Sequence, residues 1–186
     1  MEKILSYLRA MRLLGMARTW QNLMEAHKAD SISLTDGIRL LIQGENDMRM
    51  SNRTLRLIKN AHFRYTVTLG EIRADSVRGI EQSLLNEVAT CDYITHGYPI
   101  IITGPTGTGM SWLASALSHH ACLCGYKVRY YNVVKLFEDL TMARIESRLP
   151  KLFERLSQFD LLILDDFGIK KLSTEQVLDL ILSNIT

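Results

Sequence analysis

Apolar residues in the first third of the chain recur three and four positions apart, which is the spacing of one face of an α-helix. Two such sets open the chain: Ile4, Leu8 and Met11, then Trp20, Leu23 and Met24. Gly15 lies between the two sets and is the predicted break. Ser33 followed by Asp36 is a capping-box pattern, with Asp in place of Glu, and it predicts the start of a further helix.

The helical pattern continues behind this start with one interruption. Its apolar positions are Ile38, Leu41, Ile42, Met48, Leu55 and Ile58. Residues 64–76 have no clear period, and we interpret them as a linker. A helix is predicted over residues 79–94, because Ile80, Leu84 and Val88 fall on one side of it.

From residue 97 onward, short apolar runs alternate with helical segments. The predicted strands are residues 99–103, 127–131 and 161–166, and the predicted helices are residues 112–124, 133–144 and 149–157. Gly125 is a typical stop after the first of these helices. Apolar strands that alternate with helices predict a parallel sheet, so the expected fold class is α/β, preceded by an all-helical N-terminal region.

Composition narrows the class of protein. With 186 residues, of which 47% are hydrophobic and 23% charged, the chain has the composition of a globular protein. No apolar run approaches the roughly 18 residues of a membrane span. The N-terminus lacks a secretory pattern, and three cysteines fit a reducing compartment. A cytoplasmic protein without membrane association is therefore expected.

Charge is distributed unevenly along the chain. Residues 1–70 contain 11 Lys and Arg against 6 Asp and Glu, a balance of +5, whereas residues 71–186 contain 11 against 14, a balance of −3. One helix face in the basic part carries four cations: Arg49, Arg53, Arg56 and Lys59. This stripe fits a contact with a polyanion, and a solvated helix surface is the alternative interpretation.

The residues after the first predicted strand have the pattern of a phosphate-binding loop. They are Gly104, Pro105, Thr106, Gly107, Thr108, Gly109, Met110, Ser111 and Trp112. Backbone N–H groups at such a strand-to-helix turn bind phosphate oxygens, and Ser111 stands where a hydroxyl binds Mg²⁺. Met110 occupies the position of the usual lysine and supplies no charge. A glycine-rich turn without a ligand is the alternative.

The third predicted strand ends in two aspartates, as a Walker B strand does. Asp165 is the candidate for holding Mg²⁺, and Asp166 is the candidate catalytic residue that orients or deprotonates the attacking water. The glycine-rich loop precedes them by roughly sixty residues in the expected strand–helix order. Together the two motifs predict a nucleotide site.

Both motifs, with the sequence between them, resemble the IstB-like ATPases, which are helper proteins of insertion-sequence transposition related to DnaC-type helicase loaders within AAA+. The resemblance rests on residues 13–17, 87–91, 104–109, 126–129 and 159–168. It implies an AAA+ type P-loop NTPase core that binds ATP and Mg²⁺, after a helical region for contact with DNA or a transposase. With this resemblance, DNA becomes the expected partner of the basic stripe: Arg49, Arg53, Arg56 and Lys59. Family members assemble on DNA in an ATP-dependent way, so a homo-oligomer is a further expectation.

Two departures from the family pattern argue against ATP hydrolysis. Met110 replaces the lysine, and the chain reaches Thr186 before any segment that resembles a sensor-1 strand, an arginine finger or a sensor-2 helix. The core is therefore expected to be incomplete and truncated, with hydrolysis lost or severely impaired. In the AAA+ order a later strand separates residues 99–103 from residues 161–164, so these two strands are expected either to lie apart or to pair directly.

The cysteines and histidines near residue 120 are a weaker candidate for chemistry. Cys122 and Cys124 lie two positions apart, with His119 and His120 beside them. Positions i and i+2 do not share a helix face, so buried thiols and surface histidines are favoured over a metal site.

The expected organisation is a basic helical region over residues 1–70, a connecting helical region over 71–96 and the P-loop core over 97–186. The expected function is that of an ATP-binding, DNA-associated helper protein of transposition. The alternative is a non-catalytic remnant that binds DNA or a transposase without nucleotide.

Overall fold

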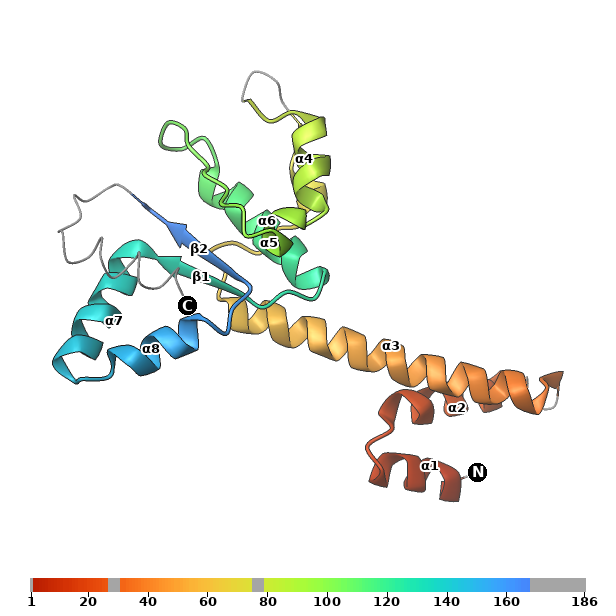
Figure 1. Ribbon diagram of the computed structural model, residues 1–186. Helices are drawn as coiled ribbons and strands as arrows, with labels where there is room; N and C mark the ends of the chain where they lie inside the picture. The colour runs from red at the N-terminus through yellow and green to blue at the C-terminus, as the bar shows by residue number, and fades with distance from the viewer. Residues whose placement is uncertain (1, 27–30, 75–78, 168–186) are drawn as a thin grey trace. The chain divides into compact units, whose positions relative to one another are not determined.

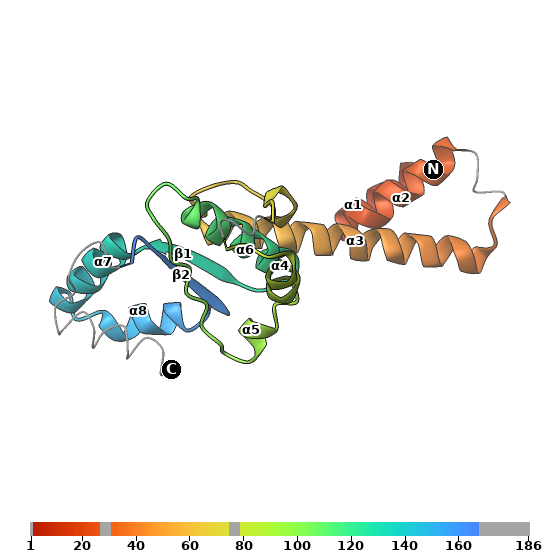
Figure 2. The same cartoon turned by 90° about the horizontal axis from the view of Figure 1, so that it is seen from above.

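The computed structural model describes residues 2–26, 31–74 and 79–167, and it divides into two compact units, Met1–Leu55 and Arg56–Thr186 (Figures 1 and 2). In chain order the elements are α1 (Glu2–Ala10), α2 (Leu14–Glu25), α3 (Leu34–Ala61), the 3-10 helix η2 (Leu69–Glu71), α4 (Gln82–Ala89), α5 (Asp92–Thr95), α6 (Met110–Leu123), β1 (Val128–Asn132), α7 (Val133–Ile145), α8 (Leu149–Leu156) and β2 (Leu161–Asp165). The chain is thus mixed α/β and mostly helical. The part of the predicted core after residue 167 lies outside the described residues.

Gly15 has a different role from the predicted one. The chain turns between α1 and α2 around Arg12, whose φ is +60°, whereas Gly15 lies inside α2. A Cβ atom on Gly15 would lie 2.3 Å from the carbonyl oxygen of Gly44 and 2.5 Å from the Cα of Glu45. The prediction of a break at Gly15 is therefore wrong, because this glycine is needed where α2 and α3 cross closely.

The start predicted for the next helix is confirmed. Ser33 Oγ donates to the Asp36 carboxylate at 2.7 Å and accepts from the Asp36 N–H at 3.2 Å. From this cap, α3 runs for 28 residues without interruption. The helices α1, α2 and α3 give the N-terminal region its expected helical character.

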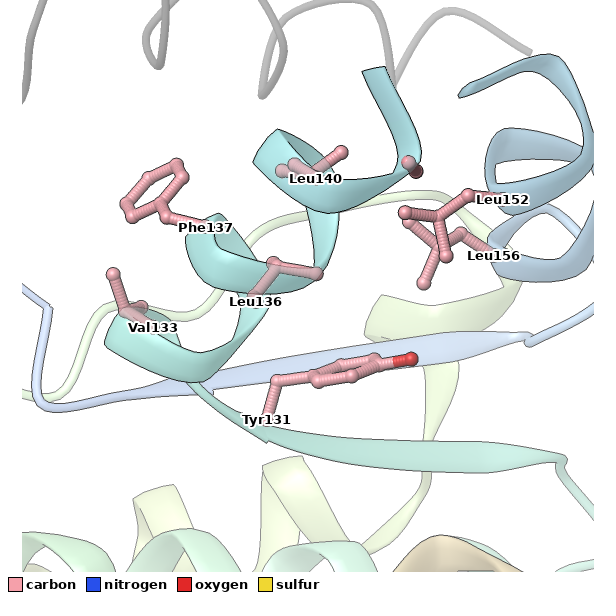
Figure 3. Close-up of a cluster of buried hydrophobic side chains, with 8 residues drawn as sticks. Tyr131, Val133, Leu136, Phe137, Leu140, Leu152 and Leu156 are labelled. Atoms are coloured by element: carbon pink, nitrogen blue, oxygen red, sulfur yellow. The ribbon is translucent and has the colours of Figure 1, made fainter. Parts of the chain in front are cut away.

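Among the described residues the sheet consists of β1 and β2, which pair in parallel with Val128 opposite Leu161 and Asn132 opposite Asp165. Side chains alternate between the two faces of such a pair. On one face, Tyr131, Leu162 and Leu164 pack against apolar residues of α7 and α8. Figure 3 shows Tyr131 on this face, on the side of Leu136 of α7 and Leu156 of α8. Both strands, and the helices predicted at residues 112–124, 133–144 and 149–157, are confirmed to within two residues at each end.

The other face of the sheet is covered by α6 and the end of α3. Val128, Leu161 and Ile163 pack there with Ala121 and Cys122 of α6, together with Ala61, Leu57 and Ile58. Gly125, with φ of +95°, ends α6 as predicted. The sheet therefore lies between two helical layers, and Asp165, two residues after Ile163, follows the face that α6 covers.

The predicted strand at residues 99–103 is wrong. These residues carry no strand assignment, and Ile100 and Ile101 expose 42% and 83% of their surface. A β-branched run becomes a strand only when a neighbouring strand accepts its backbone hydrogen bonds. Within the described ranges, β2 pairs only with β1, so residues 99–103 do not join the sheet.

Two further predictions need correction. The predicted helix over residues 79–94 is two helices, α4 and α5, because Cys91 between them has a φ of +61°. Residues 64–76 are also more than a linker. Val67 is 1% exposed, and a capping box in which Thr68 N–H donates to Glu71 at 2.9 Å starts η2, which contacts α6.

Among the described residues, no helix combines the length and the apolar character that crossing a membrane requires.

Candidate nucleotide-binding site

The predicted phosphate loop turns directly into α6. Gly107 and Gly109 have φ of +87° and +91°, a left-handed conformation that favours glycine. Thr108 closes the loop by donating to the carbonyl of Pro105 from its N–H and from its hydroxyl. Gly109 is the N-cap of α6, so the first N–H groups of the helix have no partner within it. Such N–H groups form an anion-binding site together with the positive end of the helix dipole.

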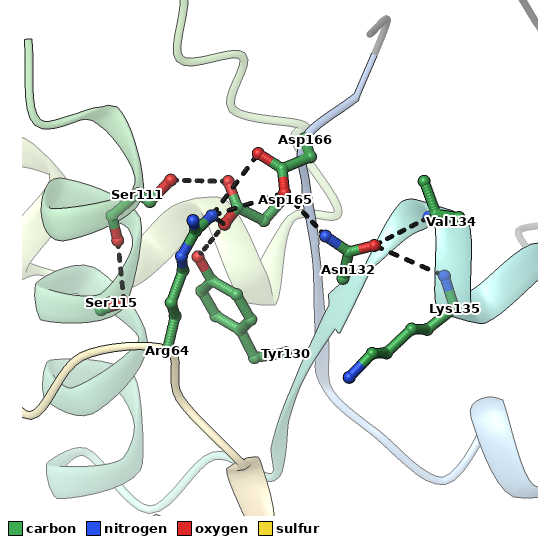
Figure 4. A network of polar contacts seen from close by, with 9 residues as sticks. All are labelled: Arg64, Ser111, Ser115, Tyr130, Asn132, Val134, Lys135, Asp165 and Asp166. Atoms are coloured by element: carbon green, nitrogen blue, oxygen red, sulfur yellow. Dashed lines mark hydrogen bonds and ion pairs between the residues drawn. The ribbon is translucent and has the colours of Figure 1, made fainter. Parts of the chain in front are cut away.

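Ser111 and Asp165 are 54 residues apart in sequence and meet at this end of the sheet. Ser111 Oγ donates to Asp165 Oδ1 at 2.8 Å, and the Tyr130 hydroxyl donates to Asp165 Oδ2 at 2.8 Å (Figure 4). Tyr130 and Asp165 come from neighbouring parallel strands and share the face that α6 covers. The structure thus brings together the two residues that the sequence predicts as Mg²⁺ ligands.

Arg64 joins this cluster from the segment after α3. Its Nη1 lies 2.8 Å from Asp165 Oδ2 and 3.4 Å from both carboxylate oxygens of Asp166. The guanidinium carbon lies 5.6 Å from the ring centre of Tyr65, and that ring lies 5.5 Å from the Trp112 ring. Sequence reasoning missed Arg64 because it treated residues 64–76 as a linker. One sequence signal indicates that a cation must come from elsewhere in the chain. Two adjacent aspartates end a strand, and the glycine-rich loop over residues 104–111 contains no lysine or arginine.

Asp166 lies at the rim of the same cluster. The Asn132 side chain donates to Asp166 Oδ2 at 2.7 Å, and its oxygen caps α7 by accepting from the N–H groups of Val134 and Lys135. Asp166 itself has a φ of +61°, in the left-handed region. Asn132, which the sequence analysis also missed, therefore links the start of α7 to the predicted catalytic residue.

The electrostatics of the cluster favour an ionised Asp165. Burial opposes ionisation, but the hydrogen bonds from Arg64, Tyr130 and Ser111 outweigh it and hold the pKa of Asp165 below its ordinary value of 3.8. Burial raises the pKa of Tyr130, and the bond to Asp165 raises it further, so Tyr130 stays a donor. An ionised carboxylate beside a serine hydroxyl is a set of hard oxygen ligands, which Mg²⁺ prefers.

Nearly the whole sequence matches a known protein family. Residues 6–184 match the family model described as IstB-like ATP binding protein. The chain belongs to this family. The IstB-like chain is 33% identical over 178 residues to a protein of Pseudomonas fluorescens named for insertion sequence IS1162 and for ATP binding, covering 95% of this chain and 77% of the relative. It is 32% identical over 177 residues to y4pL of Sinorhizobium fredii, named in the same terms, covering 95% and 72%.

A more distant relative carries a similar name. The protein of Geobacillus stearothermophilus named for insertion sequence IS5376 and for ATP binding is 25% identical over 171 residues, covering 92% of this chain and 68% of the relative. The P-loop type of fold expected from the sequence is that of the IstB-like family.

The residues of this IstB-like site fit ATP in the shape of the loop and in the oxygen groups of Ser111 and Asp165, but the loop lacks the usual positive charge. The Met110 sulfur would lie 3.5 Å from a Cβ atom on Gly104, so the methionine side chain lies against the start of the loop. Residues Gly104, Pro105, Thr106, Gly107, Thr108 and Gly109 are exposed, as is Trp112. At position 110, an uncharged thioether takes the place of the ammonium group that pairs with phosphates.

The four cations predicted to contact DNA all lie on α3 of this IstB-like protein. Arg49 pairs with Glu45, its Nε lying 2.7 Å from Glu45 Oε1, and still exposes 65% of its side chain. Arg53, Arg56 and Lys59 are exposed as well. The stripe therefore has the accessibility that contact with a polyanion requires.

The two cysteines that lie close together in space are Cys91 and Cys124, and not the pair Cys122 and Cys124 that the sequence suggested. Sulfur and nitrogen atoms of Cys91, His120 and Cys124 lie within 4.8 Å of one another, whereas Cys122 is buried in the core. His120 Nε2 lies 2.9 Å from the carbonyl oxygen of Ala89. Burial, together with the contact to Cys124, raises the pKa of Cys91 to about 12, which disfavours the thiolate that binds metal. Cys91 is therefore a neutral thiol in this trio.

Proposed function

We propose that this chain is an ATP-binding helper protein of insertion-sequence transposition, acting in the cytoplasm on DNA together with a transposase. The observation that carries the proposal is the contact between Ser111 of the glycine-rich loop and Asp165 at the end of β2. The names of the relatives, which refer to ATP binding and to insertion sequences, support it.

In this proposal the core over residues 97–186 is of the AAA+ type and binds the triphosphate at the loop. Residues 104–109 and the first N–H groups of α6 surround the phosphates, and Trp112 borders them. Ser111 and Asp165 would hold Mg²⁺, which would offset the charge of the phosphates, and Asp166 would orient an attacking water if hydrolysis occurred. Because Met110 brings no charge to the transferring phosphate, we expect binding with little or no hydrolysis.

The helical region over residues 1–70 is proposed to contact DNA, with residues 71–96 connecting it to the core. Support comes from its balance of +5 and from four exposed cations on α3: Arg49, Arg53, Arg56 and Lys59. If each of the four cations contacts one phosphate, the stripe contributes about −3 to −4 to the slope of the logarithm of the DNA association constant against the logarithm of salt concentration. ATP-dependent assembly of several copies on DNA is part of the proposal.

Binding of a fluorescent ATP analogue to the full chain tests the nucleotide part. The wild-type chain is expected to bind it weakly, and Ser111→Ala is expected to weaken binding about threefold in Mg²⁺ and to leave it unchanged in EDTA. Ser157→Ala, which removes an exposed hydroxyl at the end of α8, is the matched control. Wild-type binding too weak to measure, with no gain from Met110→Lys, would instead favour the nucleotide-free remnant that the methionine suggests.

Salt-dependent DNA binding tests the other part. Replacing Arg49, Arg53 and Arg56 by Ala is expected to flatten the salt slope by about 3 and to weaken binding to all DNA sequences alike. The matched control replaces three exposed cations at the start of α8 and along it: Arg148, Lys151 and Arg155. If the salt slope of the arginine triple variant equals that of wild type, the stripe is an ordinary solvated helix surface and not a DNA contact.

A further inference from the structure

The phosphate site carries an imbalance of charge that one residue offsets. Asp165 and Asp166 bring two negative charges to the end of β2, and Met110 brings none. Arg64 is the cation that the structure pairs with both aspartates, at 2.8 Å and 3.4 Å. A triphosphate that enters beside Ser111 adds further negative charge, so its binding needs a cation at this place.

The position of Arg64 suits that need. Its Nη1 and Ser111 Oγ bind the two oxygens of the same carboxylate, Asp165 Oδ2 and Oδ1 (Figure 4). The Asp165 carboxylate therefore bridges the guanidinium group and Ser111 in the first turn of α6. It exposes 45% of its side chain and has five N–H donors, more than these contacts use. A planar guanidinium can bind a phosphate oxygen while it keeps its bond to a carboxylate.

We propose that Arg64 is the phosphate-binding cation of this site and takes over the charge that Met110 does not supply. The inference rests on the proposed nucleotide binding and extends it to a residue outside both motifs. The segment between α3 and η2 is then part of the nucleotide site, held in place by the burial of Val67 and by the capping box that starts η2.

The same contact has a consequence for Mg²⁺. Arg64 and a metal ion beside Ser111 both interact with the Asp165 carboxylate, and their positive charges repel each other. The nucleotide is therefore expected to bind almost as well without Mg²⁺ as with it. In a P-loop protein that relies on lysine and Mg²⁺, removal of the metal weakens binding.

The test measures the dissociation constant of a fluorescent ATP analogue for the full chain, in excess EDTA and in excess Mg²⁺. For wild type the two values are expected to agree within about threefold. In EDTA, Arg64→Ala and Arg64→Gln are both expected to weaken binding at least about tenfold, although Gln keeps an N–H donor for Asp165. Arg148→Ala is the matched control, because Arg148 is an exposed arginine of the same unit that pairs with Glu146. This control is expected to leave binding unchanged.

Rescue separates loss of charge from loss of folding. Met110→Lys is expected to restore binding at least about tenfold in the Arg64→Ala chain and to add less in the wild-type chain, since either cation can serve the phosphates. Unchanged binding by Arg64→Ala in EDTA, or the same gain from Met110→Lys in both backgrounds, would overturn the role of Arg64. Absence of binding by wild type and by Met110→Lys would overturn the proposed function itself.

Discussion

Each of the two units of the molecule contains one largely buried carboxylate that is paired with an arginine. Glu45 in the helical unit and Asp165 in the α/β unit expose 10% and 11% of their side chains. Glu45 accepts from the backbone N–H groups of Gly15 and Met16 at 2.8 and 3.2 Å, and from Arg49. Asp165 accepts instead from two side-chain hydroxyls and from an arginine 101 residues away in sequence.

The difference lies in which partners can be exchanged. The donors of Glu45 are backbone groups in the first turn of α2, and the arginine lies on the same helix as Glu45, so breaking these bonds means separating α2 from α3. The donors of Asp165 are side chains that rotate about single bonds, and Arg64 is half exposed. Equal burial therefore gives a structural carboxylate in one unit and a carboxylate able to exchange partners in the other.

The largest expected effect is on the helix crossing that positions Glu45. Gly15→Ala places a Cβ atom 2.3 Å from the Gly44 carbonyl oxygen, so α2 and α3 must move apart, at a cost of about 3 kcal/mol or more in the free energy of unfolding. Urea unfolding followed by circular dichroism measures this. The control is Gly37→Ala on α3, where a Cβ atom meets nothing within 4 Å and the higher helix propensity of Ala adds roughly 0.5–1 kcal/mol of stability. Equal changes in the two variants would contradict the close crossing.

The two carboxylates are expected to differ when each is removed. Glu45→Ala leaves two N–H groups of α2 without their acceptor and is expected to cost about 2 kcal/mol, with no change in nucleotide affinity. Asp165→Ala is expected to cost about 1 kcal/mol, less than Glu45→Ala, since the half-exposed Arg64 can turn to water while the buried Tyr130 hydroxyl loses its acceptor. In EDTA it should tighten binding of an ATP analogue, because Arg64 no longer shares its charge with that carboxylate. The reverse pattern would show that the structural role belongs to Asp165.

A smaller difference in stability is expected between two helix N-caps, one in each unit. Asn132 caps α7 and also binds Asp166, whereas Ser33 caps α3 within an exposed capping box. Asn132→Ala is expected to cost about 1.5 kcal/mol of unfolding free energy, and Ser33→Ala about 0.5–1 kcal/mol. Thermal unfolding of the two variants beside wild type measures the difference. If Ser33→Ala costs more, the contact between Asn132 and Asp166 adds no stability.

The smallest expected effect is on the pH dependence of stability. The hydrogen bond and charge of Arg49, with the N–H groups of α2, outweigh burial and lower the pKa of Glu45 below its ordinary value of 4.5. The pKa of Asp165 is lowered below 3.8. The stabilisation is therefore fully present above these ordinary values and is lost as the pH falls through the lower folded-state values. Urea titrations between about pH 3 and 6 should show a shallower acid loss for Glu45→Gln than for wild type.

The sequence predicts the α/β part well where local signals agree. Strands and helices between residues 110 and 165 follow from apolar periodicity, from Gly125 and from the two motifs, and the meeting of Ser111 with Asp165 follows from their order. The strand at residues 99–103 is wrong because strand formation depends on a neighbour, which a local pattern does not contain. Gly15 was misinterpreted because a glycine that permits close packing and a glycine that breaks a helix look identical in one sequence. Arg64 was missed because its partner is 101 residues away.

The left-handed backbone of Asp166 restricts which amino acids evolution can place there. With a φ of +61°, the position suits Asp, Asn and Gly, whereas a β-branched residue would add roughly 1–2 kcal/mol of strain. Asn is the replacement that keeps both this conformation and an oxygen for the Asn132 amide while it removes the charge. A single conservative substitution, Asp166→Asn, would therefore remove the acidic group without straining the backbone. Related chains that no longer act on a bound nucleotide are expected to carry Asn or Gly at this position.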